Sequence, residues 1–223
     1  MPTNTPIART PLAAWHERAG ATLETINGWQ TATRYPSGAT AGSSSSANGV
    51  IDAGATGSAS ANLLLDRSHL ATFEINGPET GAALTALCGE DVPLRRIHSA
   101  DGRDAYRLTP TRAIVFVAGA TAGLPGSAGE AIDVTGGWAT ISLIGPDSER
   151  ILSKVTAVDL RERTLPVGGC CQGPLFGVNT LFGRFDDWFD LHVCSDSAEF
   201  FWEVLLDAGA EFGLRPAGTE DVK

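Results

Sequence analysis

The sequence predicts an α+β fold built from two similar strand-helix-strand-strand halves, and an internal repeat is the main observation behind this prediction. Residues 70–92 (LATFEINGPETGAALTALCGEDV) and 138–160 (WATISLIGPDSERILSKVTAVDL) align without a gap at an offset of 68 residues. Each copy contains an alternating apolar run, a Gly-Pro-acid turn, apolar residues at helical spacing and a closing Asp-aliphatic pair. Two matching units in one chain favour two half-domains packed together.

The local chemistry of each copy predicts a strand, a tight turn and a helix. Glycine supplies the free backbone of the turn at Gly77 and Gly145. The proline that follows is preorganised for a first helical turn, and the next residue, an acid, favours a helix N-terminus. Chance agreement between two short strand-helix units is the alternative interpretation. The register nevertheless holds through strand, turn, helix and exit.

The chain before the first repeat predicts one short helix and a long loop. Thr10-Pro11 is a typical helix start and Gly20 a typical stop, with apolar side chains on one face between them. Residues 37–61 consist mainly of Gly, Ala, Ser and Thr, which carry too little apolar surface to order a segment. We expect a flexible loop there, and a lid over a site is the alternative.

After the first repeat, residues 95–117 predict a pair of strands around a turn at Ala100-Asp101-Gly102, ending in a buried strand. A Gly/Ala-rich passage, 118–130, then separates the halves.

The second repeat is followed by a predicted hairpin at 174–193 and a final helix that ends at Gly209. We therefore expect a single domain over residues 10–218, with halves at about 62–117 and 131–218.

Charge and hydropathy exclude several classes of partner. The chain has 223 residues, with 26 acidic against 16 basic side chains and a net charge of -10. This balance argues against nucleic acid or an anionic membrane as the main partner. The sequence has neither an apolar run that could span a bilayer nor a signal-peptide pattern, so we expect a cytoplasmic protein.

Cofactor motifs are absent from the sequence. The four cysteines, Cys88, Cys170, Cys171 and Cys194, lack metal-ligand spacing, and the four histidines are scattered singly, so no metal site is predicted. A GxGxxG pattern opening a strand-helix unit is also missing, so we expect no flavin or NAD site in this chain.

Three groups of residues resemble one known family. Asp66-Arg67-Ser68-His69-Leu70, then Gly77-Pro78 and Leu87-Cys88-Gly89-Glu90-Asp91-Val92, are similar to the Asp-x-Ser-His-Met, Gly-Pro and Leu-Thr-Asn-Asp-Val motifs of the glycine cleavage T-protein (aminomethyltransferase) family. The opening TPLAAWHERAGATLETINGWQTATRY and the closing FWEVLLDAGAEFGLRPAG also resemble that family. The resemblance runs from Thr10 to Gly218.

The resemblance implies a tetrahydrofolate-binding domain with a central pocket between the halves, in which one carbon is transferred to a folate amine. An aspartate orients that amine in the family, and Asp104 is the nearest candidate, one residue out of register. A turn aspartate is the alternative reading of Asp104. Asp186 falls on the glutamate that holds the pterin, and Leu70 replaces the methionine after Ser-His. Such chemistry needs a positioned carboxylate and a water-poor cavity.

Departures from the family suggest a partner. The sequence stops where the family continues into a C-terminal barrel, so the resemblance implies that this barrel is absent. The gamma subunit of heterotetrameric sarcosine oxidase is similar in this respect and assembles with subunits that carry flavin and folate. Gly169-Cys170-Cys171-Gln172-Gly173 only faintly resembles the motif of iron-sulfur-linked folate proteins, and we interpret both thiols as structural.

Three hypotheses follow. The first is a tetrahydrofolate-binding component of one-carbon transfer or demethylation, acting on a methylated amine or ether. The second is a non-catalytic gamma-type subunit of a sarcosine-oxidase-like flavoenzyme, with partner subunits or as a homo-oligomer. The third is a T-protein-like fold with unrelated chemistry, using polar groups such as Arg67, His69 or Tyr106, although a structural role for His69 is an alternative.

Overall fold

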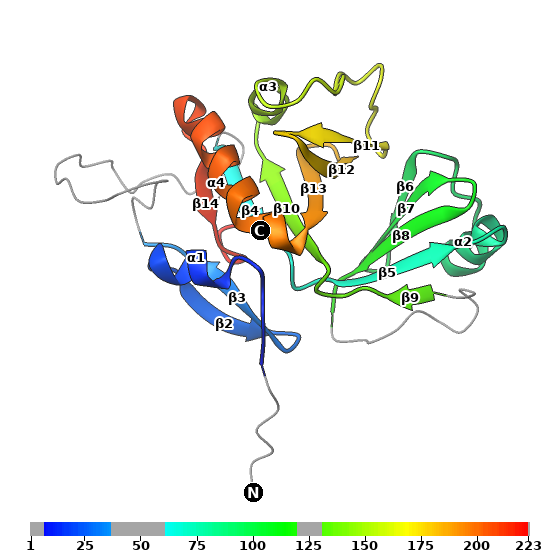
Figure 1. Cartoon of the computed structure of the whole chain (residues 1–223), viewed down its shortest axis with the longest axis horizontal. Helices are drawn as coiled ribbons and strands as arrows, with labels where there is room; N and C mark the ends of the chain where they lie inside the picture. Colours follow the sequence, from blue (N-terminus) through cyan, green and yellow to red (C-terminus); the bar gives the residue numbers. More distant parts are fainter. Residues whose placement is uncertain (1–6, 37–60, 120–130, 223) are drawn as a thin grey trace, which may run out of the picture.

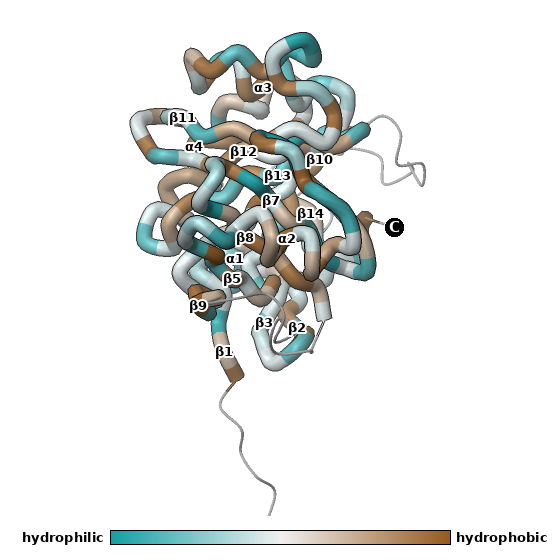
Figure 2. Tube along the Cα trace, turned by 90° about the vertical axis from the view of Figure 1, so that its right-hand side faces the viewer, coloured by the Kyte–Doolittle hydropathy of each residue, from teal (hydrophilic) through white to brown (hydrophobic). Residues whose placement is uncertain are grey.

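The computed structural model describes residues 7–36, 61–119 and 131–222. The described chain is α+β, as predicted: three sheets are accompanied by a small number of short helices (Figure 1). Hydrophobic and hydrophilic stretches alternate along the trace in Figure 2, as expected for elements with one buried and one exposed face. The predicted loop at 37–61, apart from its last residue, and most of 118–130 lie outside the described residues.

The largest sheet has six strands in the order β11-β12-β13-β10-β4-β14. Its core packs beneath α3 and α4 (Figure 1) and includes Ile141, Leu191, Phe201 and Trp202, all fully buried. The strands are β4 (Leu63–Asp66), β10 (Trp138–Ile144), β11 (Cys170–Leu175), β12 (Val178–Arg184), β13 (Trp188–Cys194) and β14 (Arg215–Ala217). The helices are α3 (Ser148–Ser153) and α4 (Ala198–Gly209), with short 3-10 turns at Ser195–Ser197 and Ala210–Phe212.

A second sheet has five strands in the order β6-β7-β8-β5-β9, with α2 (Thr80–Cys88) beside it (Figure 1). Phe73, Ile75, Leu84 and Val115 pack in the core between α2 and this sheet. The strands are β5 (Ala71–Asn76), β6 (Arg96–Ala100), β7 (Arg103–Thr109), β8 (Arg112–Val117) and β9 (Ala131–Asp133).

The N-terminal region contains the predicted helix and also an unpredicted small sheet. Helix α1 (Ala13–Arg18) accompanies β1 (Ala8–Arg9), β2 (Thr22–Ile26) and β3 (Trp29–Arg34). Asn27 and Gly28 connect β2 to β3 with φ of 52° and 84°. An Asn-Gly pair with two positive φ angles is typical of a two-residue hairpin turn, so this dipeptide was the available sequence signal.

The two repeat copies have the predicted strand-turn-helix structure and the same turn. Gly77 and Gly145 have φ of 121° and 125°, a region that side chains disfavour. The hydroxyl of Thr80 donates to the Gly77 carbonyl at 2.8 Å, and the hydroxyl of Ser148 donates to the Gly145 carbonyl at 2.8 Å. The offset found in the sequence is therefore an offset between equivalent turns.

The two larger sheets exchange strands between the predicted halves. Strand β4 lies within 62–117, yet it pairs with β10 and β14 in the six-stranded sheet. Strand β9 lies within 131–218, yet it pairs with β5 in the five-stranded sheet. The link from β4 to β5, residues 67–70, consequently passes from one sheet to the other and carries Arg67 and His69 along that path.

Candidate functional site

Arg67 joins charged side chains from both large sheets. Its Nη1 donates to Oδ2 of Asp190 on β13 at 2.9 Å, and its Nη2 lies 3.9 Å from Oδ2 of Asp104 on β7. The side chain of Asp190 is 1% exposed, whereas those of Arg67 and Asp104 are 24% and 19% exposed. The cluster therefore begins in the interior and reaches solvent at Arg67 and Asp104.

Asp190 holds the inner end of this cluster. The Ser142 hydroxyl donates to Oδ1 of Asp190 at 2.5 Å, and Arg67 binds Oδ2. Burial raises the pKa of Asp190, and Arg67 and Ser142 only partly offset that effect. Burial opposes the charge of Arg67, but the carboxylates of Asp190 and Asp104 outweigh it and raise the pKa of Arg67. Arg67 therefore stays charged and anchored to Asp190.

Asp104 has a more open setting. The Ser99 hydroxyl on β6 donates to Oδ1 of Asp104 at 2.6 Å, while Oδ2 faces Arg67 at the longer distance. One carboxylate oxygen is thus held by a neighbouring strand, and the group remains partly accessible. A carboxylate oriented in this way can accept a hydrogen bond from an amine of a ligand.

Tyr106 belongs to a buried network beside the cluster. Its hydroxyl lies 3.1 Å from Nε2 of His192, whose Nδ1 lies 3.0 Å from the Thr140 hydroxyl. The ring of Phe116 stacks on His192 with centroids 3.8 Å apart. Burial, assisted by the charge of Arg67, lowers the pKa of His192 well below its usual value, so this imidazole is neutral at pH 7.

Two further predicted residues, Leu70 and His69, lie on the link between the sheets. Leu70 is buried in an apolar cluster with Tyr106 and Phe116. His69 is half-buried, and its Nδ1 has no hydrogen-bond partner among the described residues. Burial lowers the pKa of His69, so it is neutral at pH 7. The structure thus places Leu70 and Tyr106 in the same apolar cluster, whereas His69 is not part of it.

Asp186 occupies a different environment. It lies exposed in the turn between β12 and β13 and makes no hydrogen bond with any residue that the structure describes. Its assignment as the pterin-holding residue stays a prediction.

A buried network that the sequence interpretation missed shapes the link itself. His16 Nε2 donates to Oδ2 of Asp66 at 2.9 Å, and the Tyr35 hydroxyl lies 2.5 Å from His16 Nδ1. Oδ1 of Asp66 accepts the backbone N–H of Ser68 at 2.8 Å. Burial opposes ionisation, but the hydrogen bonds from His16 and Ser68 lower the pKa of Asp66. Asp66 thereby fixes the turn that begins at Arg67.

Asp190 and Ser142 were also missed as site residues. The available signal was alternation: Asp190 and His192 interrupt the apolar strand β13, and Thr140 and Ser142 interrupt β10. Polar residues spaced by two on a strand share one face, here the face opposite the apolar core.

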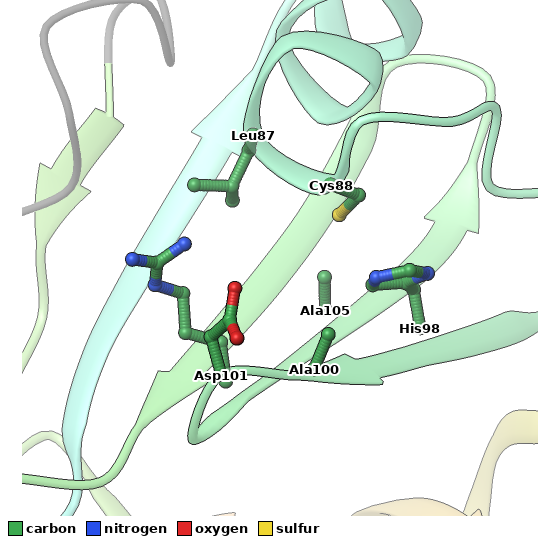
Figure 3. A pocket seen from close by; sticks show the side chains of 7 residues that line it. Leu87, Cys88, His98, Ala100, Asp101 and Ala105 are labelled. Atoms are coloured by element: carbon green, nitrogen blue, oxygen red, sulfur yellow. The ribbon is translucent and has the colours of Figure 1, made fainter.

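A small hollow lies beneath α2, where Leu87 and Cys88 face strand residues that include His98 and Ala105 (Figure 3). Its volume of about 20 Å³ suits a single water molecule. Burial raises the pKa of Cys88, so this thiol stays protonated. In the parts of the chain that the structure describes, no group of three His, Cys, Asp or Glu side chains could hold a metal ion.

The model of the GCVT N-terminal domain family matches residues 118–223. Aminomethyltransferases match along nearly the whole chain, among them that of Saccharopolyspora erythraea, 27% identical over 94% of this chain and 60% of its own length. The chain is thus similar to aminomethyltransferases of the T-protein family. The resemblance inferred from the motifs is therefore confirmed.

The other matches extend this T-protein-like assignment. The aminomethyltransferase of Streptomyces avermitilis is 31% identical over 98% of this chain and 61% of its own length. Aminomethyltransferase T of the glycine cleavage system from Bartonella henselae has a TM-score of 0.72 at 16% identity, covering 96% of this chain and 61% of that one. The chain spans about three fifths of the length of these curated relatives.

One structural match is to a chain of nearly the same length as this one. A chain of heterotetrameric sarcosine oxidase from Corynebacterium sp. U-96 has a TM-score of 0.64 at 18% identity, covering 92% of this chain and 96% of that one. Both structural matches establish the T-protein-like fold. Within the described part of the T-protein-like chain, no helix is long and apolar enough to cross a membrane.

Proposed function

We propose that this T-protein-like chain binds tetrahydrofolate as a component of one-carbon transfer or demethylation, acting on a methylated amine or ether. The observation that carries the proposal is the setting of Asp104. Its carboxylate lies at the accessible end of a cluster between the two large sheets, with one oxygen held by Ser99 at 2.6 Å. The resemblance makes Asp104 the nearest candidate, one residue out of register, for the aspartate beside the folate amine.

Arg67 supports the role of Asp104 because Asp190 holds it back. The guanidinium is 2.9 Å from Asp190 but 3.9 Å from Asp104, so it does not close over the Asp104 carboxylate. The N–H of a neutral amine can then donate to the Asp104 oxygen that faces Arg67, which leaves the nitrogen lone pair free. The Asp104 carboxylate thus provides the acceptor that a folate amine needs, and the folate would supply the nitrogen that accepts the carbon.

The test is calorimetric titration of the chain with 5-formyltetrahydrofolate. We expect micromolar binding by the unaltered chain and binding at least about tenfold weaker in Asp104→Asn, which keeps the shape but loses the charge. Asp186→Asn tests the second predicted contact, and Glu203→Gln, on the exposed side of α4, is the matched control. Absence of binding by a folded, unaltered chain would contradict the proposal.

A second candidate function is a gamma-type subunit of a sarcosine-oxidase-like assembly. The match over nearly the full length of a chain from a heterotetramer favours it. This function predicts a stable complex with a flavin-carrying subunit and no folate affinity in the chain alone. Sedimentation of the chain with and without the products of adjacent genes distinguishes it from the first function.

A further inference from the structure

A groove lies at the seam between the two large sheets, on the side where β7 meets β11. It has a volume of about 220 Å³ and is lined by Arg95, Leu108, Cys170, Cys171 and Gln172. The lining therefore combines one guanidinium and one amide with an apolar side chain and two thiols. Cys170 is buried, whereas Arg95 and Gln172 are exposed at the rim.

The backbone of Arg95 is held in an unusual conformation by both sheets. Its φ is 61°, in the left-handed region that favours glycine. The other described non-glycine residues with positive φ, Asn27, Asp101 and Phe176, each precede a glycine in a turn, and Arg95 does not. A residue held in this region is a pointer to function when its surroundings impose the conformation.

Those surroundings are two backbone hydrogen bonds. The N–H of Arg95 donates to the Arg107 carbonyl on β7 at 2.7 Å, and the Arg95 carbonyl accepts the N–H of Cys170 on β11 at 3.0 Å. The N–H and the carbonyl of Arg95 thus both bind the sheets. These two bonds fix the backbone from which the Arg95 side chain extends, at the edge of the groove.

The charge of Arg95 has no carboxylate to balance it among the described residues. By contrast, Arg107 pairs with Asp91 at 2.9 Å and Arg112 pairs with Glu74 at 2.6 Å. The Arg95 guanidinium acts on a thiol of the same groove. Burial raises the pKa of Cys171, and the positive charge of Arg95 opposes that rise. An unpaired guanidinium is a bidentate donor suited to a carboxylate.

We propose that this groove binds the carboxylate of a short organic acid, with Arg95 and Gln172 as donors and Leu108 and the two thiols against its hydrocarbon part. The groove volume of about 220 Å³ is below the range of roughly 300–1,000 Å³ typical of sites for drug-sized ligands, which favours a short acid over a whole folate. The acid is either a free metabolite or the carboxylate tail of a reduced folate. Asp104 is not among the residues that line the groove. A separate acid therefore goes beyond the proposed function, whereas a folate tail in the groove rests on that function.

The test is an NMR titration of the ¹⁵N-labelled chain with sodium pentanoate, using pentanamide as the uncharged analogue. We expect pentanoate to shift the Leu108 and Gln172 signals saturably and to slow the reaction of Cys171 with a thiol reagent. Arg95→Gln should weaken binding about tenfold, as expected for the loss of a charged hydrogen bond. Arg103→Gln, on the same sheet but outside this groove, should leave it unchanged.

Arg95→Gly provides a second variant, since glycine tolerates the positive φ and preserves folding while removing the guanidinium. Equal binding of pentanamide, or unchanged binding in both Arg95 variants, would overturn the proposal, as would unsaturable shifts in the unaltered chain. Competition of 5-formyltetrahydrofolate with pentanoate would assign the carboxylate to the folate tail. Pentanoate binding without competition would assign it to a separate acid.

Discussion

Arg67 and Asp190 form an ion pair across 2.9 Å that links the chain between the two large sheets to the interior of the six-stranded sheet. The partners are 123 residues apart in the sequence. The Asp190 side chain is 1% exposed, so its carboxylate depends on Arg67 and Ser142 for hydrogen bonds. Loss of either Arg67 or Ser142 leaves one oxygen of the buried Asp190 carboxylate without a hydrogen-bond donor.

Arg67→Ala should therefore destabilise the protein by about 3 kcal/mol, the cost of breaking a buried pair and leaving one charge behind. Proton uptake by Asp190, whose pKa is already raised by burial, should make this cost smaller at acidic pH. Urea unfolding at pH 7 and pH 5 measures both values. The double substitution Arg67→Met with Asp190→Leu should recover part of the loss, and an Arg67→Ala variant as stable as the parent would contradict the role of the pair.

His192 should make stability fall as the pH decreases below about 6.5. Its folded pKa is lowered by burial, so in that range the unfolded chain binds a proton that the folded chain does not. The sign of the linkage is then a loss of stability of up to about 1.4 kcal/mol per pH unit. Unfolding free energies of His192→Gln should show a shallower slope between pH 6.5 and 5. The same slope in the variant and the parent would refute this, and His98→Gln is the control on a partly exposed histidine.

Gly183→Ala should destabilise the protein by about 1–3 kcal/mol through overpacking. A Cβ at this position would lie 2.4 Å from the Tyr106 hydroxyl, which is fully buried and cannot move aside freely. Tyr106→Phe in the same chain should relieve part of the clash, which a double-mutant cycle measures. Gly81→Ala is the contrasting control: its Cβ would meet the end of the flexible Arg107 side chain, so we expect little loss.

Asp66→Asn should destabilise the protein by about 2 kcal/mol, because His16 and the Ser68 N–H both lose a charged acceptor in the interior. The folded pKa of Asp66 is lowered, so its contribution is present above the usual aspartate range and is lost as the pH falls through the folded pKa. The unfolding free energies of the parent and of Asp66→Asn, measured with a denaturant from pH 7 to pH 2, should become equal in acid. Parallel curves over that range would mean that the charge of Asp66 contributes nothing.

The strand-turn-helix units could be predicted because their information is local. Gly77 and Gly145 mark equivalent turns, and the spacing of the residues around them defines a strand and a helix without reference to the rest of the chain. The hairpin of β12 and β13 and the end of α4 at Gly209 follow from equally short patterns. The motif order also indicated the resemblance to the T-protein family, which the comparisons confirm.

The candidate site was predicted only in part, for a physical reason. Asp104, Tyr106 and Leu70 were identified from the resemblance, but the Asp190 and Ser142 partners of Arg67 carry no motif of their own. The pairing of β4 with β10 and of β9 with β5 likewise has no local signal. Residues far apart in the chain meet only when burial of apolar faces fixes the order of strands. The sequence by itself determined the strand-turn-helix units and the resemblance to the T-protein family, whereas tertiary packing decided which sheet each strand joins and which charges meet at Arg67.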